Sequence, residues 1–153
     1  MVTQTNRFAV GIAAVLFLFL SGCGSLLHPQ AGEFLAQAQG AGDQASSGVQ
    51  TIVNLTTMLD ASVQAARSGQ NYEAALDRLH DQFHALRKAF CLVTEAQAAT
   101  TAYAKAVTIR REMRTVFHRL WKFREDSTLR EVHLDLFAKR LQELRETVQA
   151  IKS

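Results

Sequence analysis

The fold is decided by residues 72–93, YEAALDRLHDQFHALRKAFCLV. Large apolar residues recur there at alternating intervals of four and three positions. Because an α-helix has 3.6 residues per turn, this spacing aligns them in one stripe along a helix. The stretch therefore predicts a long amphipathic helix with one buried side. The members of the stripe are Tyr72, Leu76, Leu79, Phe83, Leu86, Phe90 and Val93.

Similar stripes lie on both sides of this stretch. Upstream, residues 47–50 (Ser-Gly-Val-Gln) have the form of a capping box, and Ser68-Gly69 is a typical helix end. No glycine or proline follows Gly69, and Ala, Leu, Arg, Glu, Gln and Lys favour helices there. The remaining stripes are Val49, Ile52, Thr56, Leu59, Val63 and Ala66; Ala102, Ala106, Ile109, Met113, Val116, Leu120 and Phe123; and Leu134, Phe137, Leu141, Leu144, Val148 and Ile151.

The breaks between the stripes define the architecture. Ala102 lies nine positions after Val93, which would place the two on opposite faces of one helix, so a turn is expected within 94–101. Residues 125–128 allow two readings. They could form a connection that is followed by a second capping box of Thr128 and Glu131, or one helix could continue from 102 to 151. We predict an all-α, up-down bundle of four helices at 48–67, 71–96, 101–125 and 128–151, with Asn71 as an N-cap. The alternative is an elongated helical hairpin resembling a coiled coil.

The segment before the bundle differs in composition. Residues 24–48 are small and polar, and they contain five glycines and the only proline of the chain. This composition predicts a flexible tether over residues 23–47. Part of it could extend the first helix, because an apolar spacing is kept by Phe34, Leu35, Ala38 and Ala45.

The first residues indicate export. Arg7 precedes the apolar run 8–20 and the small residues Ser21 and Gly22, which is typical of a secretory signal peptide. Leu20-Ser21-Gly22-Cys23 resembles the lipobox of bacterial lipoproteins. The resemblance implies cleavage before Cys23, acylation of its thiol and anchoring in a membrane of the cell envelope. In enteric bacteria, an Asp directly after the lipidated cysteine resembles a signal for retention in the inner membrane. Gly24 stands at this position instead, so we expect the protein at the outer membrane, facing the periplasm. The predicted divisions are a signal peptide (1–22), a lipidated cysteine and tether (23–47) and the bundle (48–153).

Charge is modest overall but concentrated in one helix. A net charge of +3 argues against a dedicated nucleic-acid binder. Between residues 105 and 124, however, seven Lys or Arg residues accompany one Glu. With a tryptophan among them, they predict a face that binds an anionic ligand such as lipid or lipopolysaccharide. The alternative, which we favour, places Phe117 and Trp121 in the core and pairs the arginines with acidic neighbours. The candidate binding residues are Arg110, Arg111, Arg114, Trp121, Lys122 and Arg124.

Other candidate sites are weaker. His80 and His84 have the i, i+4 spacing of two metal ligands, but without a third ligand we expect them to face solvent. If Cys23 is acylated, Cys91 is either a buried thiol or half of an intermolecular disulfide. No nucleophile motif, carboxylate pair, phosphate loop or haem attachment motif is found, so we predict no enzyme and no cofactor.

The sequence thus predicts a non-enzymatic, membrane-anchored envelope lipoprotein. We expect its helical domain to dock other envelope proteins or itself, without nucleic acid and without a small-molecule substrate. The alternative function is a binding module for an anionic envelope ligand, served by the helix around residues 105–124.

Overall fold

The computed structural model describes residues 29–40, 47–69 and 71–151. Within these ranges the protein is entirely helical, with no strand. This confirms the predicted all-α class. The elements are α2 (Pro29–Gln39), α3 (Gly48–Arg67), α4 (Tyr72–Ala89), the 3-10 turn η2 (Phe90–Leu92), α5 (Glu95–Ala98), α6 (Thr101–Lys122) and α7 (Ser127–Gln149).

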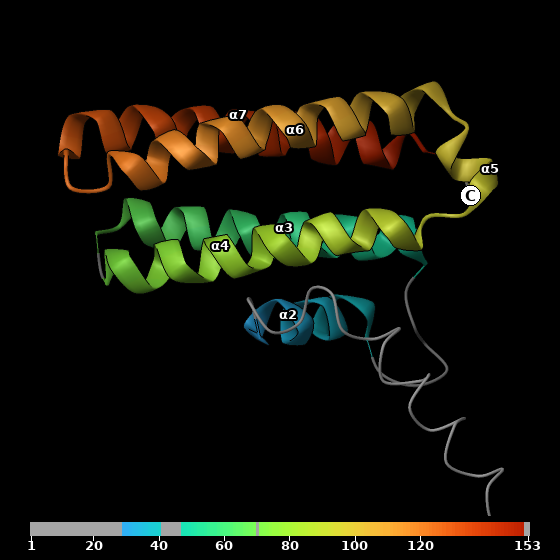
Figure 1. The fold of residues 1–153 in the computed structure, drawn as a ribbon, viewed down its shortest axis with the longest axis horizontal. Coiled ribbons are helices and arrows are strands. Elements are labelled where there is room, and N and C mark those ends of the chain that lie inside the picture. The colour runs from blue at the N-terminus through green and yellow to red at the C-terminus, as the bar shows by residue number, and fades with distance from the viewer. Residues whose placement is uncertain (1–28, 41–46, 70, 152–153) are drawn as a thin grey trace, which may run out of the picture.

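The four long helices form two antiparallel hairpins stacked on one another. Figure 1 shows α3 with α4 in one hairpin and α6 with α7 in the other, running up and down as predicted. Helix α2 covers the outer side of the α3–α4 hairpin, away from α6 and α7, so the described part has three layers (Figure 1). The predicted four-helix bundle is confirmed, with α2 and the short α5 added.

Hydroxyl and carboxylate side chains cap most helix starts. The Oγ of Ser47 accepts a hydrogen bond from the Gln50 amide at 3.2 Å, but the Gln50 side chain turns to Asn54, so only half of the predicted capping box forms. The predicted cap at Thr128 is wrong, because Asp126 caps α7 and accepts from the Leu129 amide at 3.0 Å. Asn71 precedes α4 in a left-handed conformation, without a capping hydrogen bond from its side chain.

The connections decide between the two predicted architectures. Helix α6 ends at Lys122 and α7 begins at Ser127, so the continuous helix of the alternative reading does not form. The turn predicted within 94–101 is present as α5, which opens with a complete capping box of Thr94 and Gln97. Helix α4 is shorter than its predicted range 71–96, because η2 follows Ala89 and Val93 is extended. The Tyr103 hydroxyl donates to the Phe90 carbonyl at 3.0 Å and joins this turn to α6.

The prediction of a flexible tether is wrong over Pro29–Gln39, where α2 packs on the bundle. Its small residues Ala31 and Ala38 are fully buried, and the Asn54 side chain donates to the Ala38 carbonyl at 2.8 Å. Methyl side chains allow α2 to approach α3 and α4 closely, which explains how so polar a segment can join the core. The rest of the predicted tether, residues 23–28 and 41–46, and the predicted signal peptide lie outside the described residues.

The core follows the predicted stripes closely. All six members of the last stripe are buried, and so are the central members of the stripe that opens in α4. In α6 the predicted Val116 is half-buried while its neighbour Phe117 is buried. The Phe117 ring packs against the rings of Phe83 and Phe137, whose centroids lie 5.9 and 6.2 Å from its own. Large rings thus occupy the junction of α4, α6 and α7.

Hydrogen bonds and ion pairs hold neighbouring helices in register. Ser62 donates to Gln82 across the buried α3–α4 contact at 2.9 Å, and Arg145 in α7 donates to the Thr56 carbonyl in α3 at 3.1 Å. Arg67 and Asp135 form an ion pair between the same two helices.

Cys91 lies on the surface of η2. Its thiol is free and exposed, so the interpretation of a buried thiol is wrong, and the alternative of an intermolecular disulfide stays a prediction.

Gly48, the first residue of α3, has no room for a side chain. A Cβ there would lie 2.3 Å from the Leu92 carbonyl oxygen, a backbone atom that cannot swing aside. We expect Gly48→Ala to destabilise the domain by about 1–3 kcal/mol, the usual penalty for overpacking. Gly32→Ala is the matched control, because a Cβ on this α2 residue meets nothing within 4 Å. Urea denaturation should show Gly32→Ala neutral or slightly stabilised, and equal stability of both variants would contradict the close contact at Gly48.

Candidate functional site

A groove of about 310 Å³ runs between α4 and α6. Both helices contribute alternating aromatic, histidine and arginine side chains to its walls. It adjoins a smaller pocket of about 140 Å³, and the two share Phe83, Arg87 and Arg114, so they form one surface, the α4–α6 groove. Its lining residues are His80, Phe83, His84 and Arg87 from α4 and Arg110, Arg111, Arg114, Phe117, His118 and Trp121 from α6.

The floor of the wider part consists of stacked rings. The His80 imidazole lies against both Phe117 and Trp121, with centroid separations of 5.6 and 5.5 Å. His84 meets His80 edge to face at 4.7 Å. Phe117 is buried, whereas Trp121 is only partly buried, so the tryptophan combines packing against the bundle with access to solvent. Such a floor can hold an apolar or planar group.

Four arginine side chains line the narrower part. Arg87 comes from α4, while Arg110, Arg111 and Arg114 occupy one turn and a half of α6. None of the four forms an ion pair with a carboxylate of the described residues, and no acidic side chain lines the groove. The carboxylate of Asp81 lies 3.7 Å from the His80 Nδ1 but outside the lining. This part of the groove therefore carries uncompensated positive charge.

Arg110 shows the consequence of this crowding. Burial lowers the pKa of its guanidinium from the usual value, and the like charges of Arg111 and Arg87 lower it further. Its Cζ lies 5.1 Å from the centre of the Phe90 ring, an aromatic face that partly compensates the cation. A bound anion would relieve the repulsion among these arginines.

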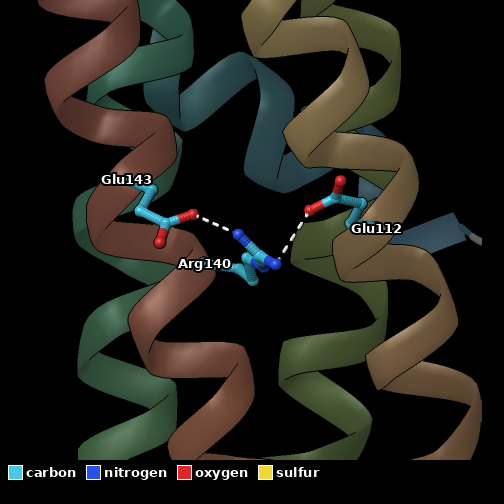
Figure 2. A network of polar contacts seen from close by, with 3 residues as sticks. All are labelled: Glu112, Arg140 and Glu143. Atoms are coloured by element: carbon cyan, nitrogen blue, oxygen red, sulfur yellow. Dashed lines mark hydrogen bonds and ion pairs between the residues drawn. The ribbon is translucent and has the colours of Figure 1, made fainter.

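Two arginines outside the groove, Arg67 and Arg140, are paired with carboxylates. Figure 2 shows Arg140 of α7 between Glu112 of α6 and Glu143 of α7, with nitrogen–oxygen distances of 3.2 and 2.5 Å. These hydrogen bonds and charges raise the pKa of Arg140. The network crosses a larger cavity of about 770 Å³ between α6 and α7. That cavity is open, and opposite charges already face each other within it, so it is a poorer candidate for a charged ligand.

The structure brings together four of the six predicted binding residues. Arg110, Arg111, Arg114 and Trp121 line the groove, but Lys122 and Arg124 do not. The Lys122 ammonium lies 5.3 Å from the Phe123 ring centre. Arg124 packs over Trp121 at 5.4 Å and donates to its carbonyl at 3.4 Å. Both residues therefore lie at the C-terminal end of α6, outside the groove.

The favoured interpretation of this helix, with core aromatics and paired arginines, is only half right. Phe117 is a core residue as expected, and Trp121 packs against the core while staying partly accessible. The expected pairing is wrong, because Arg110, Arg111, Arg114, Lys122 and Arg124 form no ion pair within the described ranges.

The α4 wall of the groove was not predicted from the sequence. His80 and His84, expected to face solvent, are both partly buried. His80 lies against the α6 rings of Phe117 and Trp121, and His84 lies against His80. Together with Phe83 and Arg87 they follow the i, i+3, i+4, i+7 spacing of one helix face, a signal that becomes meaningful once α4 and α6 are known to be neighbours. As for metal binding, no group of three or more His, Cys, Asp or Glu side chains that could hold an ion occurs in the described part.

No helix among the residues described is long and apolar enough to cross a membrane. The chain matches no family model, no curated protein and no solved structure, so the groove itself carries the functional argument.

Proposed function

We propose that the protein is a lipid-anchored, non-enzymatic binding module of the cell envelope whose α4–α6 groove binds an anionic ligand. The anchor would be the acylated Cys23, placing the bundle at the outer membrane on its periplasmic side. Lipid or lipopolysaccharide would be the ligand, and nucleic acid would not be a partner. This extends the sequence prediction for the helix around residues 105–124 to a groove with two walls.

The observation that carries the proposal is the set of four arginines without carboxylate partners above an aromatic floor. Arg110 is the partly buried member of this set, while Arg87, Arg111 and Arg114 are exposed. Burying part of a charge without a carboxylate partner costs free energy, so a group such as Arg110 is commonly kept to meet a ligand. Binding without catalysis is favoured because the groove lining offers imidazoles but neither a nucleophilic hydroxyl or thiol nor a carboxylate.

Charge reversal in the groove tests the proposal. In the chain from Gly24 onward, Arg110, Arg111 and Arg114 would be replaced by Glu, and binding to phosphatidylglycerol vesicles would be measured. Each cation near an anionic surface contributes roughly 1 kcal/mol, so we expect the dissociation constant to rise at least about a hundredfold. Trp121 fluorescence should shift to the blue when the parent binds, and added salt should weaken binding.

The matched control reverses Arg78, Arg119 and Lys139, which are exposed and lie outside the groove. It makes the same change in net charge, so it should retain most of the binding. Circular dichroism should show unchanged helix content in both variants. Equal loss in both would indicate attraction by net charge alone and contradict a specific groove.

Docking of other envelope proteins, or of a second copy, is the second candidate function. Leu129, Val132 and Leu136 are exposed along one face of α7, and apolar residues in such a row are frequent at protein interfaces. The vesicle experiment separates the two candidates. If Trp121 already emits in the blue without vesicles and does not respond to them, docking becomes the better explanation.

A further inference from the structure

We propose that the α4–α6 groove is built for a phosphate monoester carried on an apolar body. The arginine part binds the phosphate, and the aromatic part holds the atoms next to it. This inference rests on the proposed function and names the chemistry of the ligand. The phosphate could belong to a lipid headgroup or to a soluble ester, and the test below separates these sources.

The arginine part fits phosphate better than a singly charged anion. Arg87, Arg110, Arg111 and Arg114 all line one pocket of only about 140 Å³, so four positive side chains share a small volume. A phosphate monoester carries up to two negative charges and several acceptor oxygens at neutral pH. Guanidinium groups bind phosphate oxygens in pairs through their planar arrangement of N–H donors. Several arginines from two helices can therefore share one phosphate.

The aromatic part fits what is attached to the phosphate. It shares Phe83, Arg87 and Arg114 with the arginine part, so a ligand that fills both needs no break between them. Phe117 and Trp121 give it an apolar floor, and the volume of about 310 Å³ accommodates a short alkyl or ring-shaped group. His118 stands among the lining residues, where an imidazole N–H group can donate to an oxygen near the ester bond.

Neither half of the groove would be sufficient by itself. An inorganic phosphate would leave the ring-lined part in contact with water, and a neutral apolar molecule would leave the four cations without a partner. Binding that depends on both halves is therefore the property that distinguishes this site from a general basic surface.

The test uses the full chain inserted in phosphatidylcholine vesicles and the emission of Trp121, the single tryptophan of the sequence. Hexyl phosphate, hexyl sulfate, inorganic phosphate and hexanol would be titrated in turn. We expect hexyl phosphate to give a saturable change at concentrations at least tenfold below those needed for the other three. Arg87→Gln with Arg114→Gln should weaken hexyl phosphate binding at least tenfold.

Arg78→Gln with Arg119→Gln is the control, because these exposed arginines come from the same two helices and line neither part of the groove. It should bind hexyl phosphate as the parent does, and both double variants should keep the parent's helix content. To identify the source, phosphatidic acid would be added to the vesicles. If phosphatidic acid competes with hexyl phosphate, the site is assigned to a lipid headgroup. If hexyl phosphate binds undiminished in its presence, the site is assigned to a soluble ester.

Three results would overturn the inference while leaving anion binding by the protein intact. Inorganic phosphate as tight as hexyl phosphate would remove the role of the apolar body. Hexyl sulfate as tight as hexyl phosphate would remove the preference for a doubly charged anion, and an unaffected Arg87/Arg114 variant would place the ligand elsewhere. If the Trp121 emission changed with none of the ligands and not with anionic vesicles, the proposed function would be overturned as well.

Discussion

Leu141→Asp is expected to unfold the helical domain at room temperature. The Leu141 side chain in α7 is 1% exposed and lies among the largest buried residues of the core. Removing a buried leucine side chain costs about 2–5 kcal/mol, and an unpaired carboxylate in its place adds several more. A domain of this size is stable by about 5–15 kcal/mol in total, so the sum exhausts most or all of that stability. Loss of helical circular dichroism, or a melting temperature lower by tens of degrees, would be the observed result.

Leu136→Asp, in the same helix, provides the control. Its side chain is 43% exposed, so an aspartate there stays hydrated and should change stability by less than about 1 kcal/mol. Leu86→Asp in α4 should behave like Leu141→Asp, because Leu86 is fully buried in the same core. If Leu141→Asp and Leu136→Asp melted at the same temperature, the orientation of α7 in the bundle would be wrong.

The success of the sequence prediction for the long helices has a simple origin. A stripe such as Leu134 to Ile151 records, in one dimension, which side of a helix is buried, and all its members are buried in the fold. The ends were also readable where a hydroxyl or glycine has a local role, as at Ser47 and at Gly69, whose φ is +71°. Local chemistry sufficed in these cases because each interaction spans only a few residues.

Helix α2 was missed because its contribution to the core is small in volume. Ala31 and Ala38 are buried completely, yet alanine gives a weak periodic signal beside Gly32 and several glutamines. What identifies α2 is its contact with the α3–α4 hairpin, including the hydrogen bond from Asn54. An interaction of this kind depends on residues far apart in the sequence and leaves no local pattern.

The candidate site, too, could be predicted from the sequence only in part. The arginines of α6 were recognised because they are crowded in one segment, with Trp121 near them. Arg87 was not recognised, and His80 and His84 were considered only as metal ligands, because their place in the groove depends on α4 and α6 lying side by side. Whether an arginine is neutralised also depends on packing. Arg140 meets Glu112 across two helices, whereas Arg114 meets no described carboxylate.

Cys23→Ser is expected to abolish lipid attachment and with it the stable association of the protein with membranes. Acylation at a lipobox requires the thiol, which serine lacks, so labelling with a fatty-acid analogue should fall to background and the uncut precursor should accumulate. Each buried methylene of an acyl chain contributes about 0.8 kcal/mol to membrane binding, so losing the chains changes partitioning by many orders of magnitude. The measurements are metabolic lipid labelling and the mobility of the precursor on a gel.

Cys91→Ser is the matched control, because it removes the only other cysteine of the chain. Cys91 is exposed on η2, so a serine there should leave the fold, the lipid and the membrane fraction unchanged. Comparing the two variants separates loss of the anchor from general loss of a thiol. Lipid labelling of the Cys23→Ser protein at the parental level would show that the lipobox resemblance is misleading. The bundle would then reach its ligand without a lipid anchor at Cys23.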